Sequence, residues 1–409
     1  MSILRNSAWN IAGFIIPSVV AIPSLGIMAR ELGVERFGIF MIAFAIIGYA
    51  SIFDAGLSRA VIREISIHRN NPTEQSRIIG TSLLTISILG LIGSATLFSI
   101  ADLFPHILNT TKQYHHEVIS SIKILSTAIP IFLATMIWTA HLEGLERFKN
   151  INLQKIASTT LIAGLPVLAL QSAPTLENAI LGLVIARLAT ATLAFLMSKI
   201  ALNGEPLAVN KITFHRLIKF GGWITVSNII SPIMVYFDRF IISNTLGASK
   251  VGYYAAPSEA ISKLLAIPGA IARALFPRLS STSNNKSLHQ SGALAIFIIC
   301  LPICMIIFFG AEKIIELWLG NKYIDQSTTI LKILSIGFLF NAMAQIPFTS
   351  LQSKGRSKTT ALVHACEVGP YLATLLYLTN TLGLNGAAIA WSLRTAVDFT
   401  VLTILAKKL

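Results

Sequence analysis

Hydrophobic residues occur along this chain in long unbroken runs, and short polar segments separate one run from the next. A run of about 17 to 25 apolar residues is long enough to cross the hydrocarbon core of a bilayer as a helix. The runs are continuous rather than alternating, and a lone span must satisfy its own backbone hydrogen bonds, so helices are predicted rather than strands. About twelve runs meet this criterion: residues 9–28, 37–53, 78–100, 118–139, 151–170, 178–197, 220–242, 252–276, 293–309, 328–346, 359–377 and 385–404.

The composition agrees with this pattern. Hydrophobic residues make up 54% of the chain and charged residues 12%, and the mean hydropathy is +0.71. An ordinary soluble protein is about 25% charged, so a chain this apolar needs lipid to cover part of its surface. No polar stretch is long enough for a soluble domain. The predicted fold class is an all-α polytopic membrane protein with about 12 transmembrane helices.

The net charge of +14 fits the same picture. Lys and Arg residues stand singly between the apolar runs and concentrate in alternate loops, as at Arg59, Arg63 and Arg69 after the second run. Nucleic-acid binding would instead predict a basic polar face or a disordered tail, so this class of partner is not expected. Because cytoplasmic loops of membrane proteins hold the excess of Lys and Arg, both termini are predicted to be cytoplasmic.

The stretch LGVERFGIF in the first half of the chain has an echo, LGASKVGYY, 214 residues later. This echo predicts a duplicated unit of about six helices, and because six is even, both copies share one orientation. The two lobes are then related by a pseudo-two-fold axis along the membrane normal. The polar segment between the copies places the boundary after residue 205, with helices 1–6 in residues 1–205 and helices 7–12 in residues 206–409.

Gly33 and Gly247 occupy equivalent places in the two copies of this stretch, in short turns between paired spans. A glycine in such a turn supplies either a positive φ angle or a close backbone approach. We predict one of these roles for both residues.

Charged residues inside the predicted spans point to function. An ionised side chain at the bilayer centre is costly, so each one must face the interior of the helix bundle, pair with another charge, or reach the membrane surface. Asp238 and Arg239 are neighbours on a helix and point about 100° apart, so neither side chain is expected to be the main partner of the other. Two interpretations remain: they anchor the helix at the interface, or they line the mouth of a cavity.

In the eighth run, Glu259, Lys263 and Arg273 fall within about 40° of one another on a helix. Such a stripe is a poor face for lipid, and we interpret it as lining a water-filled lumen. The alternative is that Glu259 and Lys263 form an i,i+4 pair that stabilises their own helix.

Three other spans also contain charges. Arg187, in the sixth run, has no acid within a turn, so it is predicted to meet an acid from another helix or an anionic ligand. Arg394 and Asp398 have i,i+4 spacing in the last run. Glu367 and His364 in the eleventh run are candidate proton carriers, since such residues in spans often mark relays, and a buried structural pair is the alternative.

Several motifs are absent. The sequence contains no GxxxxGK[ST] phosphate-binding loop, no HExxH motif and no cluster of Cys and His, so neither a nucleotide motor nor a metal enzyme is indicated. The three cysteines lie in apolar runs without zinc-like or disulfide-like spacing. We predict no cofactor, no metal and no catalytic residue.

The pieces KFGGW, YFDRFII, LGASKVGYY and ALFPRLS resemble the seventh and eighth spans of bacterial polysaccharide flippases. LGVERFGIF and FDAGLSRAVIREIS in the first half, and the basic loops LEGLERFKNINLQ and LQSKGRSKTTAL, extend the resemblance over the whole chain. The chain thus resembles the polysaccharide (O-antigen) flippase family, which belongs to the multidrug/oligosaccharidyl-lipid/polysaccharide exporter superfamily.

This resemblance implies two six-helix lobes around a central cavity. It also implies a transporter, not an enzyme, in the bacterial inner membrane. The implied cargo is an undecaprenyl-diphosphate-linked oligosaccharide, an O-antigen-type unit of lipopolysaccharide biosynthesis. It would move from the cytoplasmic to the periplasmic leaflet by alternating access. Expected partners are the bilayer, a proton or sodium counter-ion, and a polysaccharide polymerase and chain-length regulator.

Arg and Lys suit phosphate oxygens. We therefore expect four bases to line the path and hold the diphosphate: Arg187, Lys263, Arg273 and Arg394. Candidate ion carriers are Glu259, Glu367 and Asp398, and Asp238 and Arg239 are assigned to the cavity mouth.

Alternative functions stay open. A multidrug cation antiporter of the same fold would be expected to carry acids in its N-lobe cavity, where only Asp54 stands near the inner margin. A lipid II flippase would be expected to have about two more spans than the number counted here. A membrane polysaccharide polymerase is a rival from a different class.

Overall fold

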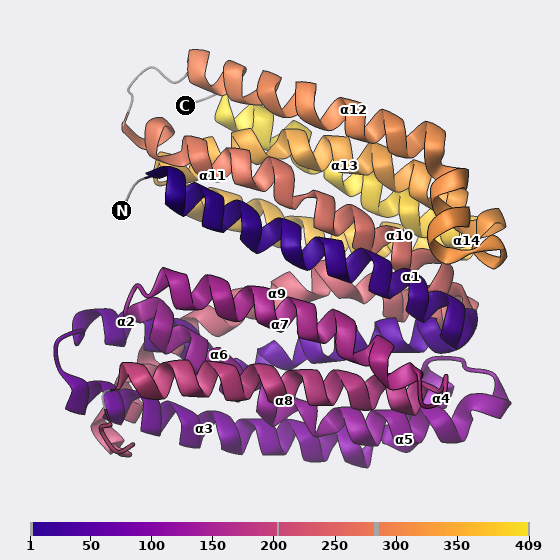
Figure 1. Ribbon diagram of the computed structural model, residues 1–409. Helices are drawn as coiled ribbons and strands as arrows, with labels where there is room; N and C mark the ends of the chain where they lie inside the picture. The colour runs from indigo at the N-terminus through magenta and orange to yellow at the C-terminus, as the bar shows by residue number, and fades with distance from the viewer. Residues whose placement is uncertain (1–2, 203, 282–285, 408–409) are drawn as a thin grey trace. The chain divides into compact units, whose positions relative to one another are not determined.

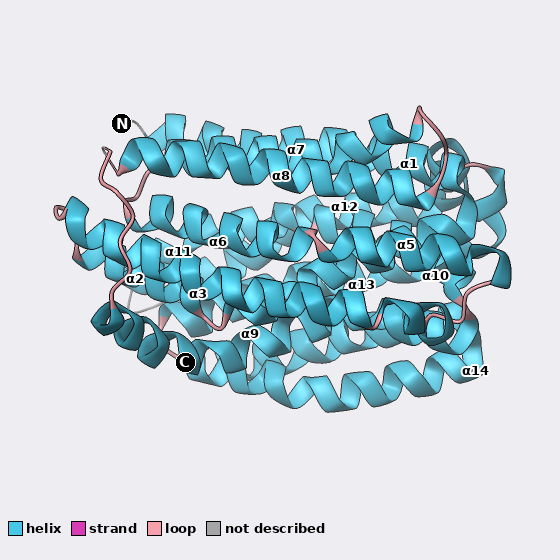
Figure 2. Ribbon diagram, turned by 90° about the horizontal axis from the view of Figure 1, so that it is seen from below, coloured by secondary structure: helices cyan, strands magenta, loops and turns pink. Residues whose placement is uncertain are grey.

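The computed structural model describes residues 3–202, 204–281 and 286–407, and over these residues it contains helices and loops but no strand (Figure 2). The helices are α1 (Ile3–Ala50), α2 (Leu57–Ile67), α3 (Pro72–Ser99), α4 (Phe104–Ile107), α5 (His115–Ser126), α6 (Ala128–Gly144), α7 (Phe148–Leu170), α8 (Leu176–Ala201), α9 (Lys211–Leu246), α10 (Ala248–Leu264), α11 (Ala266–Ser281), α12 (Lys286–Leu319), α13 (Ile324–Ser353) and α14 (Ser357–Ala406).

Every predicted apolar run lies on helix, which confirms the all-α membrane fold. Among the described residues, 8 helical segments are long and apolar enough to cross a membrane. Lys358–Ala406 contains two of the predicted runs, and Pro17–Asp54 contains one run and the second part of another. In each segment the runs lie on either side of a non-helical glycine, Gly33 or Gly383. The total of twelve crossings stays a prediction.

Two predicted runs differ from expectation, because each forms two helices instead of one. Residues 118–139 are divided between α5 and α6, and residues 252–276 between α10 and α11. In both cases a proline, Pro130 or Pro268, is the third residue of the second helix. Proline has no N–H to donate to the carbonyl four residues earlier, which belongs to the last residue of the preceding helix. The missing hydrogen bond is the physical reason for each break.

The chain divides into two compact units, Met1–Phe237 and Asp238–Leu409, and the division falls inside α9. In the first unit, α6 packs against both α3 and α8, and α7 packs on α8 and α1 (Figure 1). In the second unit, α13 packs against α12 and α14. The lobe boundary predicted after residue 205 rests on the sequence repeat and stays a prediction.

Close helix packing positions α2 in the first unit. The core-facing side of α2 is completely buried at Leu57, Val61 and Ile65. A Cβ atom added to Gly144 of α6 would lie 2.7 Å from the Ile65 side chain, so only glycine lets α2 and α6 approach this closely. Large apolar side chains on other helices are exposed instead, such as Ile306, whose exposed fraction is 68%. Exposure of this kind is expected of a surface that lipid covers.

Of the two roles predicted for Gly33 and Gly247, the backbone shows the positive φ angle at both positions. Gly33 has φ 73° and ψ 172°, and Gly247 has φ 97° and ψ 154°. These angles lie in a region that is open essentially only to glycine. The two copies of the repeated stretch therefore share an unusual backbone turn as well as a sequence.

Replacing Gly33 by alanine is expected to lower the thermal midpoint of the detergent-solubilised protein. Nothing lies within 4 Å of a Cβ at this position, so the cost is purely conformational. It should amount to about 1–3 kcal/mol.

Gly164→Ala is the matched control. Gly164 lies within α7 and also has nothing within 4 Å of an added Cβ, so alanine should stabilise the helix by about 0.5–1 kcal/mol. Shifts of the same sign in both variants would contradict the role assigned to Gly33.

Candidate functional site

The charges at the α9–α10 junction are paired across the two helices. Arg239 is only 2% exposed, and its Nη2 lies 2.9 Å from Glu259 Oε2. Lys263 Nζ lies 3.1 Å from the other oxygen of Glu259. The Tyr254 hydroxyl donates a hydrogen bond of 2.9 Å to Asp238. The side chains of Asp238 and Arg239 thus take different main partners, as predicted, and Arg239 does not reach out to the membrane surface.

These contacts change the meaning of the predicted stripe. Two acids, Asp238 and Glu259, face two bases, Arg239 and Lys263, so this cluster has no net charge. Arg273 lies beyond the break between α10 and α11 and is exposed. The i,i+4 pair that stood as the alternative is therefore present. A lumen lined by Lys263 and Arg273 stays a proposal.

Arg187 has a different environment, in the first unit. It lies on α8, and its guanidinium carbon is 4.9 Å from the centre of the Phe132 ring on α6. Its Nε atom is buried and has no hydrogen-bond partner. Within the part of the chain that the structure describes, no carboxylate forms an ion pair with it. A cation–π contact favours the guanidinium but leaves its hydrogen-bonding capacity and its charge available.

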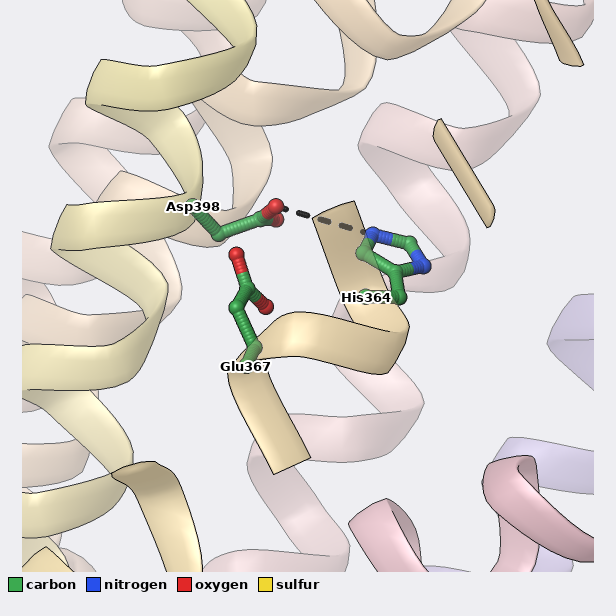
Figure 3. A group of neighbouring side chains, drawn as sticks. All are labelled: His364, Glu367 and Asp398. Atoms are coloured by element: carbon green, nitrogen blue, oxygen red, sulfur yellow. Dashed lines mark ion pairs between the residues drawn. The ribbon is translucent and has the colours of Figure 1, made fainter. Parts of the chain in front are cut away.

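Gly383 divides α14 into two arms, residues 357–382 and 384–406. These arms bring Asp398 to His364 and Glu367, which lie far from it in the sequence. His364 and Glu367 come from the first arm and Asp398 from the second, and their side chains point toward one another (Figure 3). His364 Nε2 lies 3.5 Å from Asp398 Oδ1. The candidate ligand atoms of the three residues all lie within 4.8 Å of one another, so this group could hold a cation.

Glu367 is the least satisfied member of this group. Its side chain is 10% exposed, and neither carboxylate oxygen accepts a hydrogen bond. Its ion pair with Arg394 is long, at 3.6 Å. The i,i+4 spacing of Arg394 and Asp398 therefore does not pair them with each other, because each faces a residue of the first arm.

A largely apolar groove of about 580 Å³ runs between the arms. Residues along it include Leu362, Val363, Glu367, Leu393, Arg394 and Val397.

Sequence reasoning did not find the polar network of the first unit. Glu64 on α2 is 4% exposed and lies 2.7 Å from Arg63 and 3.5 Å from Arg216. His141 on α6 is completely buried, and its Nδ1 lies 2.6 Å from the Ser198 hydroxyl of α8. Apart from Arg63, these partners stand far apart in the sequence, so no local spacing could have indicated them.

The exposed loops at the same end of the first unit are also linked by charge. Arg69, after α2, lies 2.8 Å from Glu146, after α6. The hydrogen bond from Arg69, together with its positive charge, lowers the pKa of Glu146 below its ordinary value. This pair connects two loops and marks no cavity.

Asp54 has a structural role. Its carboxylate accepts hydrogen bonds from the Ser58 backbone N–H at 3.1 Å and the Ser58 hydroxyl at 2.7 Å. It thereby caps the start of α2, where unpaired N–H groups favour a negative charge. Asp54, the acid that the antiporter alternative required in the first lobe, thus stabilises the start of α2.

Comparison with known proteins places this architecture. Residues 3–283 match the model of a family described as polysaccharide biosynthesis protein. A Shigella flexneri protein named as an O-antigen transporter is 44% identical over 407 residues, which cover 98% of this chain and 97% of that protein. A Yersinia pseudotuberculosis protein named as an O-antigen export protein is 21% identical, over 86% of this chain and 87% of its own length.

Solved structures share the fold at low sequence identity. An inward-facing multidrug resistance MATE family transporter of the MOP superfamily has a TM-score of 0.76 at 16% identity, covering 98% of this chain and 97% of its own. The lipid II flippase MurJ, in an inward closed conformation, has a TM-score of 0.83 at 12% identity, covering 98% of this chain and 87% of its own. These relatives confirm the prediction of a multi-pass membrane transporter and not an enzyme. The chain therefore belongs to the polysaccharide biosynthesis protein family.

Proposed function

We propose that this protein is a flippase that moves an undecaprenyl-diphosphate-linked oligosaccharide from the cytoplasmic to the periplasmic leaflet of the bacterial inner membrane. The Shigella relative, named as an O-antigen transporter, supports this cargo because it matches almost the whole of both chains. The division into two compact units is compatible with alternating access. The excess of basic residues in alternate loops supports cytoplasmic termini.

Arg187 is the observation that carries the proposal. Arg187 is partly buried, its Nε is fully buried, and no carboxylate pairs with it within the described residues. Such a base is costly in a membrane protein, and it is expected where an anionic ligand supplies the missing charge. A diphosphate is such a ligand, and a guanidinium can hold two of its oxygens at once. In the second unit, Arg273 stays a candidate because it is exposed. Lys263 and Arg394 stay candidates, but each already lies beside a carboxylate.

Ion coupling is assigned to the second unit. Of the three candidate carriers, Glu259 is held by two bases, so a counter-ion would have to compete with Arg239 and Lys263. Glu367 and Asp398 are better placed, because both lie in one group with His364 whose ligand atoms are close enough to share a cation. We therefore propose that a proton or sodium ion binds at Glu367 and Asp398 during the cycle.

The proposed cargo and coupling can be tested together in proteoliposomes that contain a radiolabelled lipid-linked oligosaccharide. The wild-type protein should expose the sugar to an external glycosidase, and an imposed proton or sodium gradient should change the rate. Glu367→Gln and Asp398→Asn should remove the gradient dependence, whereas Glu312→Gln, an exposed acid on α12, should keep it.

Each outcome is informative. Absence of translocation by the wild-type protein would overturn the cargo, and sugar chain growth in the same assay would favour a polymerase. Translocation that ignores both gradients would overturn ion coupling alone. A polymerase and a chain-length regulator acting after export are proposed partners that rest on the family resemblance.

A further inference from the structure

The segment formed by residues 207–219, the end of the loop after α8 and the start of α9, is fixed to the first unit along one side. The backbone N–H of Asn210 donates a hydrogen bond of 2.9 Å to the Thr81 hydroxyl on α3. A Cβ atom on Gly80 would overlap the backbone of Ala208, so the two backbones touch at a glycine. Because the contact is this close, the segment has a defined position on the first unit.

The side of this segment that faces the protein is buried, and its arginine is held in ion pairs. Arg216 Nη2 lies 2.5 Å from Glu74, and Arg216 Nε lies 3.5 Å from Glu64. Thr213 and Leu217, one turn apart, are 2% and 0% exposed. Arg216, the one arginine of the segment, is therefore held in ion pairs on the side that faces the protein.

The outer side of the segment exposes large apolar side chains, whereas a surface in contact with water would be expected to expose polar ones. Val209 is 62% exposed and Ile212 is 73% exposed. Leu207, Phe214 and Ile218 are exposed as well. Three basic or titratable side chains are interleaved with these residues and are also exposed: Lys211, His215 and Lys219.

Helix length places this outer side near the membrane surface. With 36 residues, α9 is about 54 Å long at 1.5 Å per residue. The hydrocarbon core of a bilayer is only about 30 Å thick, and the predicted span within α9 begins at residue 220. The preceding residues then lie at the depth of the lipid headgroups. Apolar side chains interleaved with lysines are typical of segments that rest in this layer and attract anionic lipids.

We propose that the outer side of residues 207–219 is a binding surface for anionic phospholipid headgroups. The aliphatic side chains enter the boundary between headgroups and acyl chains, and Lys211 and Lys219 contact the phosphates. Because the inner side is held by Glu64 and Glu74, the bound lipid is attached to the first unit. This inference does not depend on the transported cargo.

The test uses the full-length protein with its three cysteines replaced by alanine and an environment-sensitive NBD fluorophore attached at Ile212→Cys. The protein is reconstituted in phosphatidylcholine vesicles that contain phosphatidylglycerol. Quenchers are aqueous iodide and doxyl-labelled phosphatidylglycerol or phosphatidylcholine with the nitroxide beside the headgroup. Gln113→Cys, an exposed position in the short connection between α4 and α5, serves as the aqueous control.

At position 212 we expect emission at shorter wavelength than at the control, protection from iodide, and stronger quenching by labelled phosphatidylglycerol than by labelled phosphatidylcholine. Lys211→Gln and Lys219→Gln should each reduce this lipid preference, by up to about fivefold, and should leave the wavelength unchanged. Iodide quenching equal to the control would overturn the proposal, as would equal quenching by the two lipids. Protection from all quenchers would show that protein covers the surface, either the second unit or another copy, and would overturn it too.

Discussion

Replacing Arg187 by methionine is expected to abolish export of the lipid-linked cargo while leaving the folded protein at least as stable as the wild type. Arg187 packs on Phe132 and has no carboxylate partner in the described part of the chain. Replacing a charge that lies away from water by a hydrophobic side chain of similar volume is often neutral or stabilising by about 1–4 kcal/mol, and Arg187 is partly buried. Losing a buried charge contact to the diphosphate should reduce export about 30-fold or more.

Two measurements read out this prediction: surface polysaccharide in a strain that lacks its own copy of the protein, and the thermal midpoint of the purified variant. Arg59→Met provides the control, because Arg59 is exposed on α2 and is assigned no role in transport. Wild-type export by Arg187→Met would remove the basis of the proposed function. A parallel loss of export and stability would show that Arg187 serves the fold.

Replacing Glu259 by glutamine is expected to destabilise the protein by about 3–5 kcal/mol, because the change leaves the buried Arg239 without its counter-charge. Arg239 has a side chain only 3% exposed, so water cannot replace the lost carboxylate. Lys263 is affected less, because its side chain is 34% exposed. Thermal or denaturant unfolding in detergent measures the effect.

Glu316→Gln is the matched control, since Glu316 forms a short pair with Lys313 on an exposed part of α12. Its loss should cost less than about 1 kcal/mol. Adding Arg239→Met to Glu259→Gln should recover most of the lost stability, because the buried guanidinium is then removed as well and Lys263, which loses the same carboxylate, is 34% exposed. If Glu259→Gln unfolds like the control but loses gradient-driven transport, Glu259 acts as an ion carrier and not as a structural counter-charge.

Local sequence carried enough information for part of the candidate site. That Asp238 and Arg239 need separate partners follows from the angle between adjacent helical residues, and the structure confirms it. Two similar short stretches predicted either a positive φ angle or a close backbone approach at Gly33 and Gly247, and the structure shows the first. The partners themselves could not be predicted: nothing in the spacing of Arg239 and Glu259 reveals that α9 and α10 place them in contact.

The sequence by itself determined the membrane-spanning helices, the basic loops and the family, because each depends on composition, periodicity or motifs within a short stretch of chain. Only the tertiary structure decided which buried charges are neutralised. Pairing depends on which helices pack together, and this brought Glu259 to Arg239 and Glu367 to Arg394 while leaving Arg187 against an aromatic ring. Electrostatic interactions between spans depend on distance in space, and distance along the chain does not report it.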